Sequence, residues 1–230
     1  MTATRNTLLV LSLALAAGCQ SGPLGGLAWN PFSTPERTSY QTPAMRIEEA
    51  LAAGEQADGT DSAAQQAIAV ELARKVQSEP DPLVRDAIMR SVARFQIPLA
   101  GQVLTAGLQD TDPLVRRRCC QLLGERGDAA GASALAQALR ADTDQDVRIE
   151  AARALGGIRS PETNAALVAA LESDDPAMQY AGVQALSRSS GRDFGGDVRA
   201  CLAYAKGEAP AAGQPEPPAV ASRFGRLLPF

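Results

Sequence analysis

The stretch Asp112-Pro-Leu-Val115-Arg116-Arg-Arg-Cys-Cys-Gln-Leu-Leu123-Gly124 decides the fold, because its pattern returns along the chain. The Asp-x-x-Val-Arg core recurs at steps of 31, 32 and 31 residues, with a weaker last copy, and begins at Asp81, Asp112, Asp144 and Asp175. A second apolar position keeps the same steps, at Val92, Leu123, Leu155 and Leu186. Two ladders with one period indicate an internal repeat.

Each repeat unit reads as two helices. The Asp suits an N-cap, and the Pro that often follows suits the first helical position. The first helix carries an apolar stripe at helical spacing, and the second carries Leu at i and i+4, as in Leu135 and Leu139. Neither helix can bury its stripe alone, so neighbouring units must stack. We predict an all-α fold, a right-handed α-solenoid of stacked antiparallel helix pairs.

The unit D-P-x-V-R-x-x-A-x-x-x-L-G, a turn and then A-L-x-x-x-L resembles the short bacterial HEAT repeats of the phycobilisome-lyase-like class, over about residues 62–206. The resemblance implies a ladder of Asp and Arg side chains between adjacent repeats, made by Asp81, Arg85, Asp112, Arg116, Asp144, Arg148 and Asp175. Gln179 interrupts it in the last repeat. From the residues alone, the same positions serve as N-caps and as i,i+4 ion pairs.

Composition excludes several functions. The chain has 230 residues, a net charge of −4, 4% aromatic residues and no histidine. A dedicated nucleic-acid binder normally carries a basic face, and histidine is required for a Ser-His-Asp triad or a His-ligated metal. The di-iron hydroxylases of this repeat type need His-Glu pairs. We therefore expect no catalytic residue, no cofactor, no bound metal and no nucleic acid, and we expect that the chain is not an enzyme.

Three further patterns receive structural interpretations. The run that starts at Asp142 imitates a calcium loop, but Val147 and Arg153 stand where that loop needs Gly and Glu. Cys119 and Cys120 occupy apolar repeat positions and are expected to be buried, with a disulfide to the distant Cys201 disfavoured. The arginines at 116–118, together with Arg126, are expected to form a solvated face.

The N-terminus reads as an export signal. One basic residue precedes a short apolar run, and Ala16-Ala-Gly-Cys19 resembles the lipobox of bacterial lipoproteins. The resemblance implies cleavage before Cys19, a diacylglycerol thioether and an N-acyl chain on Cys19, and Gln20 favours the outer membrane. The alternatives are a plain secretory signal and an uncleaved anchor.

We divide the chain into a signal peptide (1–18), a flexible tether (19–43), a HEAT-repeat solenoid (44–206) and a Pro/Ala-rich disordered tail (207–230). The expected function is a membrane-anchored scaffold of the bacterial cell envelope, facing the periplasm, that binds another protein through a curved face lined by second helices. One alternative is a lyase or isomerase that holds a cofactor in the concave groove. The other is a purely structural envelope protein.

Overall fold

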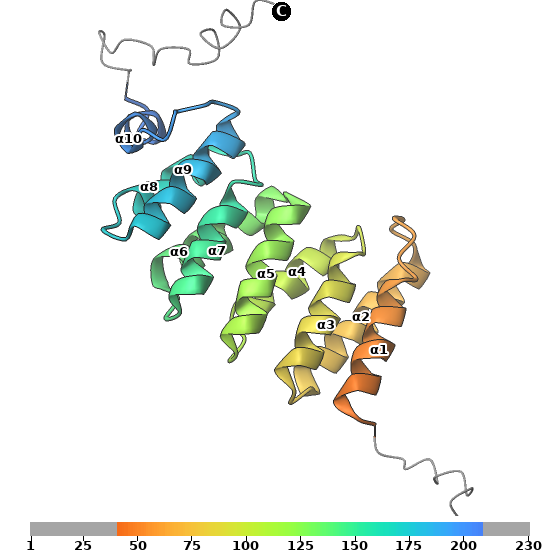
Figure 1. The fold of residues 1–230 in the computed structure, drawn as a ribbon. Coiled ribbons are helices and arrows are strands. Elements are labelled where there is room, and N and C mark those ends of the chain that lie inside the picture. Colours follow the sequence, from red (N-terminus) through yellow and green to blue (C-terminus); the bar gives the residue numbers. More distant parts are fainter. Residues whose placement is uncertain (1–40, 209–230) are drawn as a thin grey trace, which may run out of the picture. The chain divides into compact units, whose positions relative to one another are not determined.

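The computed structural model describes residues 41–208, and that part of the chain is all-helical (Figure 1). Successive helices stack into a solenoid, so the predicted fold class is confirmed. The predicted signal peptide, Cys19, and nearly all of the predicted tether and tail lie outside the described residues. The helices are α1 (Pro43–Gly54), α2 (Ala63–Ser78), α3 (Pro82–Ala93), α4 (Pro98–Gly107), α5 (Pro113–Arg126), a 3₁₀ turn (Ala129–Gly131), α6 (Ala132–Ala141), α7 (Gln145–Leu155), α8 (Pro161–Leu171), α9 (Pro176–Ser190) and α10 (Val198–Ala205).

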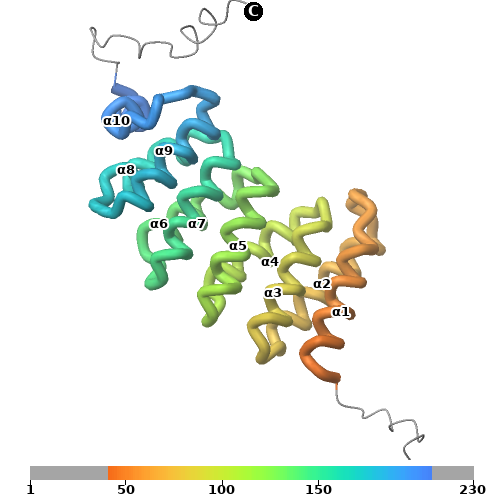
Figure 2. The backbone as a smooth tube through the Cα atoms, viewed as in Figure 1, coloured from red at the N-terminus to blue at the C-terminus, as the bar shows by residue number. Residues whose placement is uncertain are grey.

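The helices form two layers. The first helices of the pairs, α1, α3, α5, α7 and α9, pack side by side, and the second helices lie behind them (Figures 1 and 2). We call the outer surface of the first layer the first-helix face. The terminal helix α10 packs on α8 and α9 and covers the end of the core.

The first helices begin where the repeat pattern predicts. Asp81 accepts a hydrogen bond from the amide of Leu83 at 2.9 Å, and Asp112 does the same for Leu114. Asp175 caps α9 in the same way through the amide of Ala177, and Asp144 caps α7 through the amide of Val147, three residues on. Such a cap satisfies an amide that the helix itself leaves without an acceptor. Proline at the first helical position of α3, α5 and α9 removes another donor that would lack a partner.

The core is a continuous run of aliphatic side chains between the layers. The apolar ladder positions of the first helices, such as Leu123 and Leu155, are almost fully buried. The second helices contribute Leu104, Leu135 and Leu167, each with no exposed surface. Since each helix buries its stripe only against its neighbours, the repeats hold one another in place.

Glycine and alanine let the first helices approach closely near their C-terminal ends. A Cβ on Gly124 would lie 2.6 Å from the Cα of Ala154, and one on Gly156 would lie 2.7 Å from the Cα of Ala185. No side chain fits at such distances, so these glycines fix the spacing of α5, α7 and α9. The second helices α4, α6 and α8 have far fewer contacts with one another.

Candidate functional site

A groove of about 760 Å³ lies on the first-helix face. It crosses α5, α7 and α9, and we call it the α5–α9 groove. Its floor consists of small residues at the close helix contacts, namely Gly124, Ala154, Gly156, Gly157 and Ala185. The repeat pattern led us to expect the binding face on the second helices, whereas this hollow lies on the first helices. The reason is the Gly and Ala at their C-terminal ends, which leave a channel without large side chains.

The walls of the α5–α9 groove are polar and charged. From α5 and α7 come Gln121, Glu125, Glu150 and Arg153, and from the turn after α7 comes Arg159. Helix α9 contributes Tyr180, Gln184 and Arg188. The side-chain amide of Gln184 donates to the Tyr180 hydroxyl at 3.2 Å, which holds the exposed ring against α9. Except for Arg153, which was named only as a mismatch to a calcium loop, none of these residues was singled out from the sequence, because together they form no known motif.

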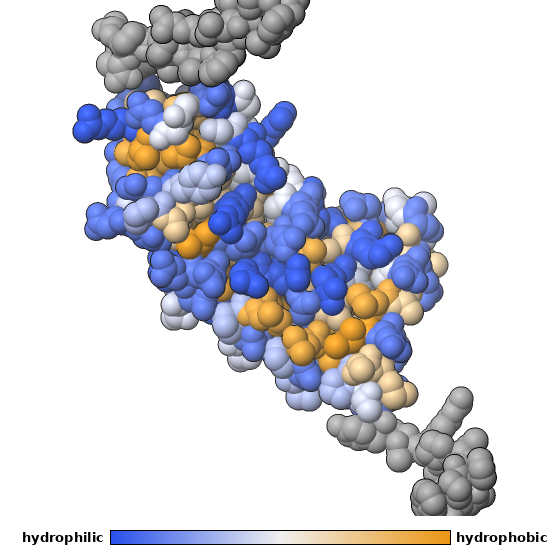
Figure 3. Space-filling model, viewed as in Figure 1, coloured by the Kyte–Doolittle hydropathy of each residue, from blue (hydrophilic) through white to orange (hydrophobic). Residues whose placement is uncertain are grey.

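A second feature of this face is a line of exposed apolar side chains near the start of the first helices. Met45, Leu83 and Leu114 are 51%, 57% and 36% exposed, and each lies two or three residues after an N-cap. Apolar residues gather on this face in Figure 3, over the N-terminal repeats. Leu83 and Leu114 hold the same repeat position, so two neighbouring repeats expose a large apolar side chain at the same place on this face.

Arginines of the first helices tie each repeat to the next, and we call these contacts the arginine ladder. Arg85 donates from Nε and Nη2 to both carboxylate oxygens of Asp110, at 2.8 and 2.7 Å. Arg116 binds Asp142 in the same bidentate way, at 2.8 Å for each bond. Each guanidinium also donates from Nη1 to backbone carbonyls in the loop before its own helix. One side chain therefore joins two consecutive loops.

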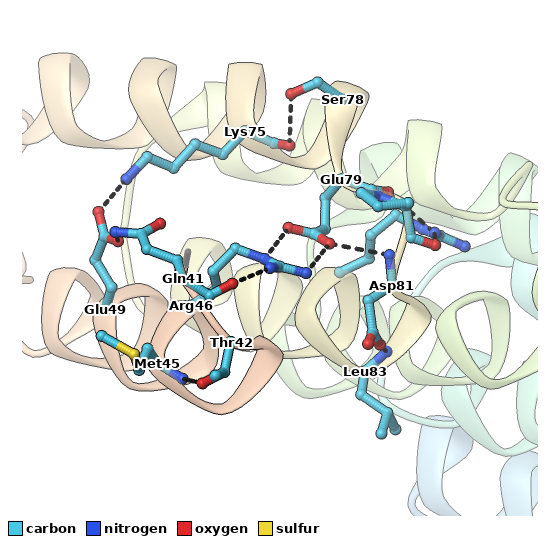
Figure 4. A network of polar contacts seen from close by, with 12 residues as sticks. Gln41, Thr42, Met45, Arg46, Glu49, Lys75, Ser78, Glu79, Asp81 and Leu83 are labelled. Carbon is cyan, nitrogen blue, oxygen red and sulfur yellow. Dashed lines mark hydrogen bonds and ion pairs between the residues drawn. The ribbon is translucent and has the colours of Figure 1, made fainter. Parts of the chain in front are cut away.

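Figure 4 shows the first step of the arginine ladder, at the N-terminal end of the solenoid. Arg46 of α1 binds Glu79 through Nε and Nη2, at 2.9 and 3.0 Å. Glu79 also accepts from the amide of Asp81, which in turn caps α3. The carboxylate thus organises the loop as well as receiving the arginine.

The pairing that the sequence analysis expected is wrong in one respect. Asp81, Asp112, Asp144 and Asp175 do not bind the ladder arginines, because their carboxylates accept backbone amides at the helix starts. The partners are the acidic residues two positions earlier, Glu79, Asp110 and Asp142. These residues recur at steps of 31 and 32, so the signal was present in the sequence.

The ladder stops at α7. Arg148 donates to the backbone carbonyl of Asp142 at 2.7 Å, as its counterparts do, but the next acidic position holds Ser173. In the last repeat Gln179 replaces the arginine and donates to the carbonyl of Ser173 at 2.7 Å. The contact between α7 and α9 therefore lacks the ion pair that the earlier repeats have.

Two carboxylates of the ladder, Asp110 and Asp142, are held in the charged form. Burial works to raise the pKa of Asp142, but hydrogen bonds from Arg116 and from the Asp144 amide outweigh it and lower the pKa below its ordinary value. The pKa of Asp110 is lowered for the same reasons, with Arg85 as the cation. Folding therefore gains stability above pH 4, near the unfolded pKa of about 3.9, and loses it as the pH falls through the lower folded value.

The arginine cluster at 116–118 is not the solvated face that the sequence suggested. Besides Arg116, Arg118 binds the buried Asp86 of the preceding repeat at 2.8 Å. Arg126, with a side chain only 8% exposed, donates to the carbonyl of Phe95 at 2.9 Å and pairs with Asp128. Arg117 alone of these four is exposed. Most of this positive charge therefore joins repeats.

Cys119, Cys120 and Cys201 are buried free thiols, as their apolar repeat positions indicate. Burial raises the pKa of Cys120 to about 12 and that of Cys201 to about 11, so both are protonated at neutral pH. A thiol reacts as its thiolate, and these side chains are therefore inert in the folded protein. Cys19, the predicted lipidation site, lies outside the described residues.

Within residues 41–208, no group of three or more His, Cys, Asp and Glu side chains is arranged to hold a metal ion. The acidic run at 142–146 is otherwise engaged, since Asp142 binds Arg116 and Asp144 caps α7. None of the described helices has the length and apolar character needed to cross a membrane.

The fold is similar to that of two solved proteins. Human deoxyhypusine hydroxylase, solved in complex with glycerol, matches at 28% identity with a TM-score of 0.51, over 54% of this chain and 44% of that one. This chain thus spans less than half the length of that enzyme. An engineered protein matches at 23% identity with a TM-score of 0.47, over 74% of this chain and 82% of that one. No curated protein sequence matches the chain.

The similarity to a hydroxylase contradicts the expectation that the chain is not an enzyme. That expectation rested on the missing histidine, which removes particular residues and not catalysis as a whole. A comparison of the sequence with family models identifies the repeat itself. The family model of HEAT repeats matches residues 69–147 and 132–203, more than half of the chain. With the arginine ladder and the stacked helix pairs, this match shows that the chain belongs to the HEAT-repeat family.

Proposed function

We propose that this chain is a protein-binding scaffold whose binding surface is the first-helix face. The observation that carries the proposal is the α5–α9 groove, an open hollow across three successive first helices with exposed polar side chains. The exposed line of Met45, Leu83 and Leu114 extends the same face towards α1. Repeat arrays generally use such long, continuous surfaces to bind other proteins.

Site-specific crosslinking tests this proposal. A photoreactive amino acid placed at Tyr180, which is 62% exposed beside the groove, should capture one reproducible partner in intact cells. The matched control is the same amino acid at Ala169, which is exposed on the second helix α8. Equal products from both positions, or none from either, would argue against a binding role for the first-helix face and would favour a purely structural one.

We also propose that the scaffold is anchored to a bacterial envelope membrane, at the outer membrane and facing the periplasm, through lipid on Cys19. The support is the sequence Ala16-Ala-Gly-Cys19 after a short apolar run. Two or more acyl chains give stable anchoring, whereas one gives only marginal binding. Metabolic labelling with a fatty-acid probe should mark the chain, and Cys19→Ser should abolish both the label and membrane fractionation. A labelled Cys19→Ser variant would refute this anchor.

The similarity to deoxyhypusine hydroxylase supports a second candidate, catalysis in the α5–α9 groove. The residues do not fit a di-iron centre, since the chain has no histidine and the groove offers two carboxylates, Glu125 and Glu150. Those carboxylates and the Tyr180 hydroxyl are the groups able to move a proton there. Mass spectrometry of a deoxyhypusine peptide incubated with the full chain tests this. Hydroxylation would take one oxygen atom from O2 and reduce the other to water with two electrons, so the incubation contains air and ascorbate as the reductant. Gain of one oxygen atom, lost in Glu150→Gln, would support hydroxylation, and an unchanged mass would exclude it.

A further inference from the structure

Two arginines of the α5–α9 groove are not neutralised within the described part of the chain. Arg159, in the turn after α7, and Arg188, in the last turn of α9, are exposed, and no hydrogen bond or ion pair holds either one within residues 41–208. A third, Arg153, lies 3.5 Å from Glu150 and is itself largely exposed. The groove therefore presents positive charge although the whole chain carries −4.

Helix ends explain only part of this charge. A cation in the last turn interacts favourably with the helix dipole, which accounts for arginines at the ends of α7 and α9. It does not account for Arg159, which lies outside any helix. Arg126, at the corresponding end of α5, donates hydrogen bonds to Asp128 and to backbone carbonyls. Among the described residues, exposed arginines without a partner also occur at Arg94, at the end of α3, and at Arg117 of α5, but of the four only Arg159 and Arg188 line the groove.

The remaining groups of the groove suit a peptide. The Tyr180 hydroxyl accepts from Gln184 and keeps its own proton available, and its exposed ring offers an apolar surface. The floor consists of small residues, so no large side chain separates it from a bound backbone. At the α5 end, Glu125 and Glu150 would repel a negative ligand, so acidic side chains must lie over α9 and the α7 turn.

We propose that the α5–α9 groove binds an extended, acidic protein segment whose carboxylates pair with Arg159 and Arg188. The proposal rests on the protein-binding function above and names the chemistry of the partner. Guanidinium groups bind carboxylates through two parallel hydrogen bonds, which gives both strength and orientation.

Fluorescence anisotropy tests the proposal with the full chain and a labelled 12-residue peptide of alternating Glu and Ser. We expect saturable binding that weakens as salt rises, and about tenfold weaker binding for the double variant Arg159→Gln, Arg188→Gln. The control is Arg94→Gln, Arg140→Gln, which removes the same charge from exposed arginines outside the groove and should leave affinity unchanged. A matching Lys-Ser peptide should not bind.

Equal losses in the two double variants would overturn the proposal, because binding would then depend on net charge alone. Tighter binding of a single-stranded oligonucleotide than of the Glu-Ser peptide would also overturn it. The two proposals fail separately. If crosslinking at Tyr180 still captures a partner in the Arg159→Gln, Arg188→Gln variant, the protein-binding function is supported. The proposal that the partner is an acidic segment bound by these arginines is then refuted.

Discussion

Replacing Asp142 with Asn tests whether the arginine ladder holds the repeats together. In the native protein Asp142 receives two charged hydrogen bonds of 2.8 Å from Arg116, and the two side chains are only 6% and 12% exposed. The amide keeps the shape but removes the charge and turns one acceptor into a donor that faces the guanidinium. Removing one partner of a buried ion pair costs about 3–5 kcal/mol.

The lower end of that range applies here. Arg116 keeps the carbonyl of Asp110 at 3.0 Å and that of Thr111 at 3.3 Å, so its charge is not left without acceptors. We therefore expect a loss of about 3 kcal/mol in the free energy of unfolding. For a folded part of this size, about 2–4 °C in Tm corresponds to each kcal/mol, which gives a fall of about 6–12 °C.

Urea unfolding followed by circular dichroism measures this loss, with Glu172→Gln as the matched control. Glu172 binds Lys206 at 2.7 Å, but their side chains are 50% and 40% exposed, so the control should cost under about 0.5 kcal/mol. Similar small losses in both variants would refute a stabilising role for the ladder. The difference between wild type and Asp142→Asn should also shrink below about pH 4, because protonation then removes the native charge as well.

Three other outcomes follow from the contacts between repeats. Ser173→Asp should extend the ladder by giving Arg148 a carboxylate, with a gain of about 1 kcal/mol in urea unfolding that disappears in an Arg148→Gln background. Gly124→Ala should lower the free energy of unfolding by about 1–3 kcal/mol, because its Cβ would lie 2.6 Å from Ala154. Gly101→Ala, whose nearest neighbour is 3.7 Å away, should be neutral or stabilising, and equal Tm values for the two variants would contradict the close packing of α5 and α7. Cys119, Cys120 and Cys201 should not react with a thiol reagent at pH 8 until urea unfolds the chain, and rapid labelling of the folded protein would contradict their burial.

The helix pairs were predictable because their signals are local. An N-cap such as Asp112 and an apolar stripe such as Val115 and Leu123 act within a few residues of themselves, so the chain reveals them without a partner. The repeat then supplies the long-range order, since one helix pair stacked on the next extends through the whole array.

The partners of the ladder arginines were not predictable in the same way. Sequence distance favours Asp112 for Arg116, four residues apart, yet Asp142 is the residue bound, 26 positions away. The carboxylate of Asp112 accepts the amide of Leu114 at the start of α5 and is therefore not the partner of Arg116. Only the structure of the helix start reveals this. The face of the groove was missed for a related reason, because Gly124 and Ala154 matter through the contact between them and not through their types.

The end of the arginine ladder and the α5–α9 groove coincide, and their coincidence has an energetic consequence. The contact between α7 and α9 lacks the ion pair that joins α3 to the loop before α5, because Ser173 stands in the acidic position. In a linear array each interface contributes separately, so this one should open more readily than those before it. A segment that binds Arg159 on the α7 side and Arg188 on α9 would bridge the interface. By linkage, such a ligand would stabilise the C-terminal repeats more than the N-terminal ones, where the ladder already supplies the bridge.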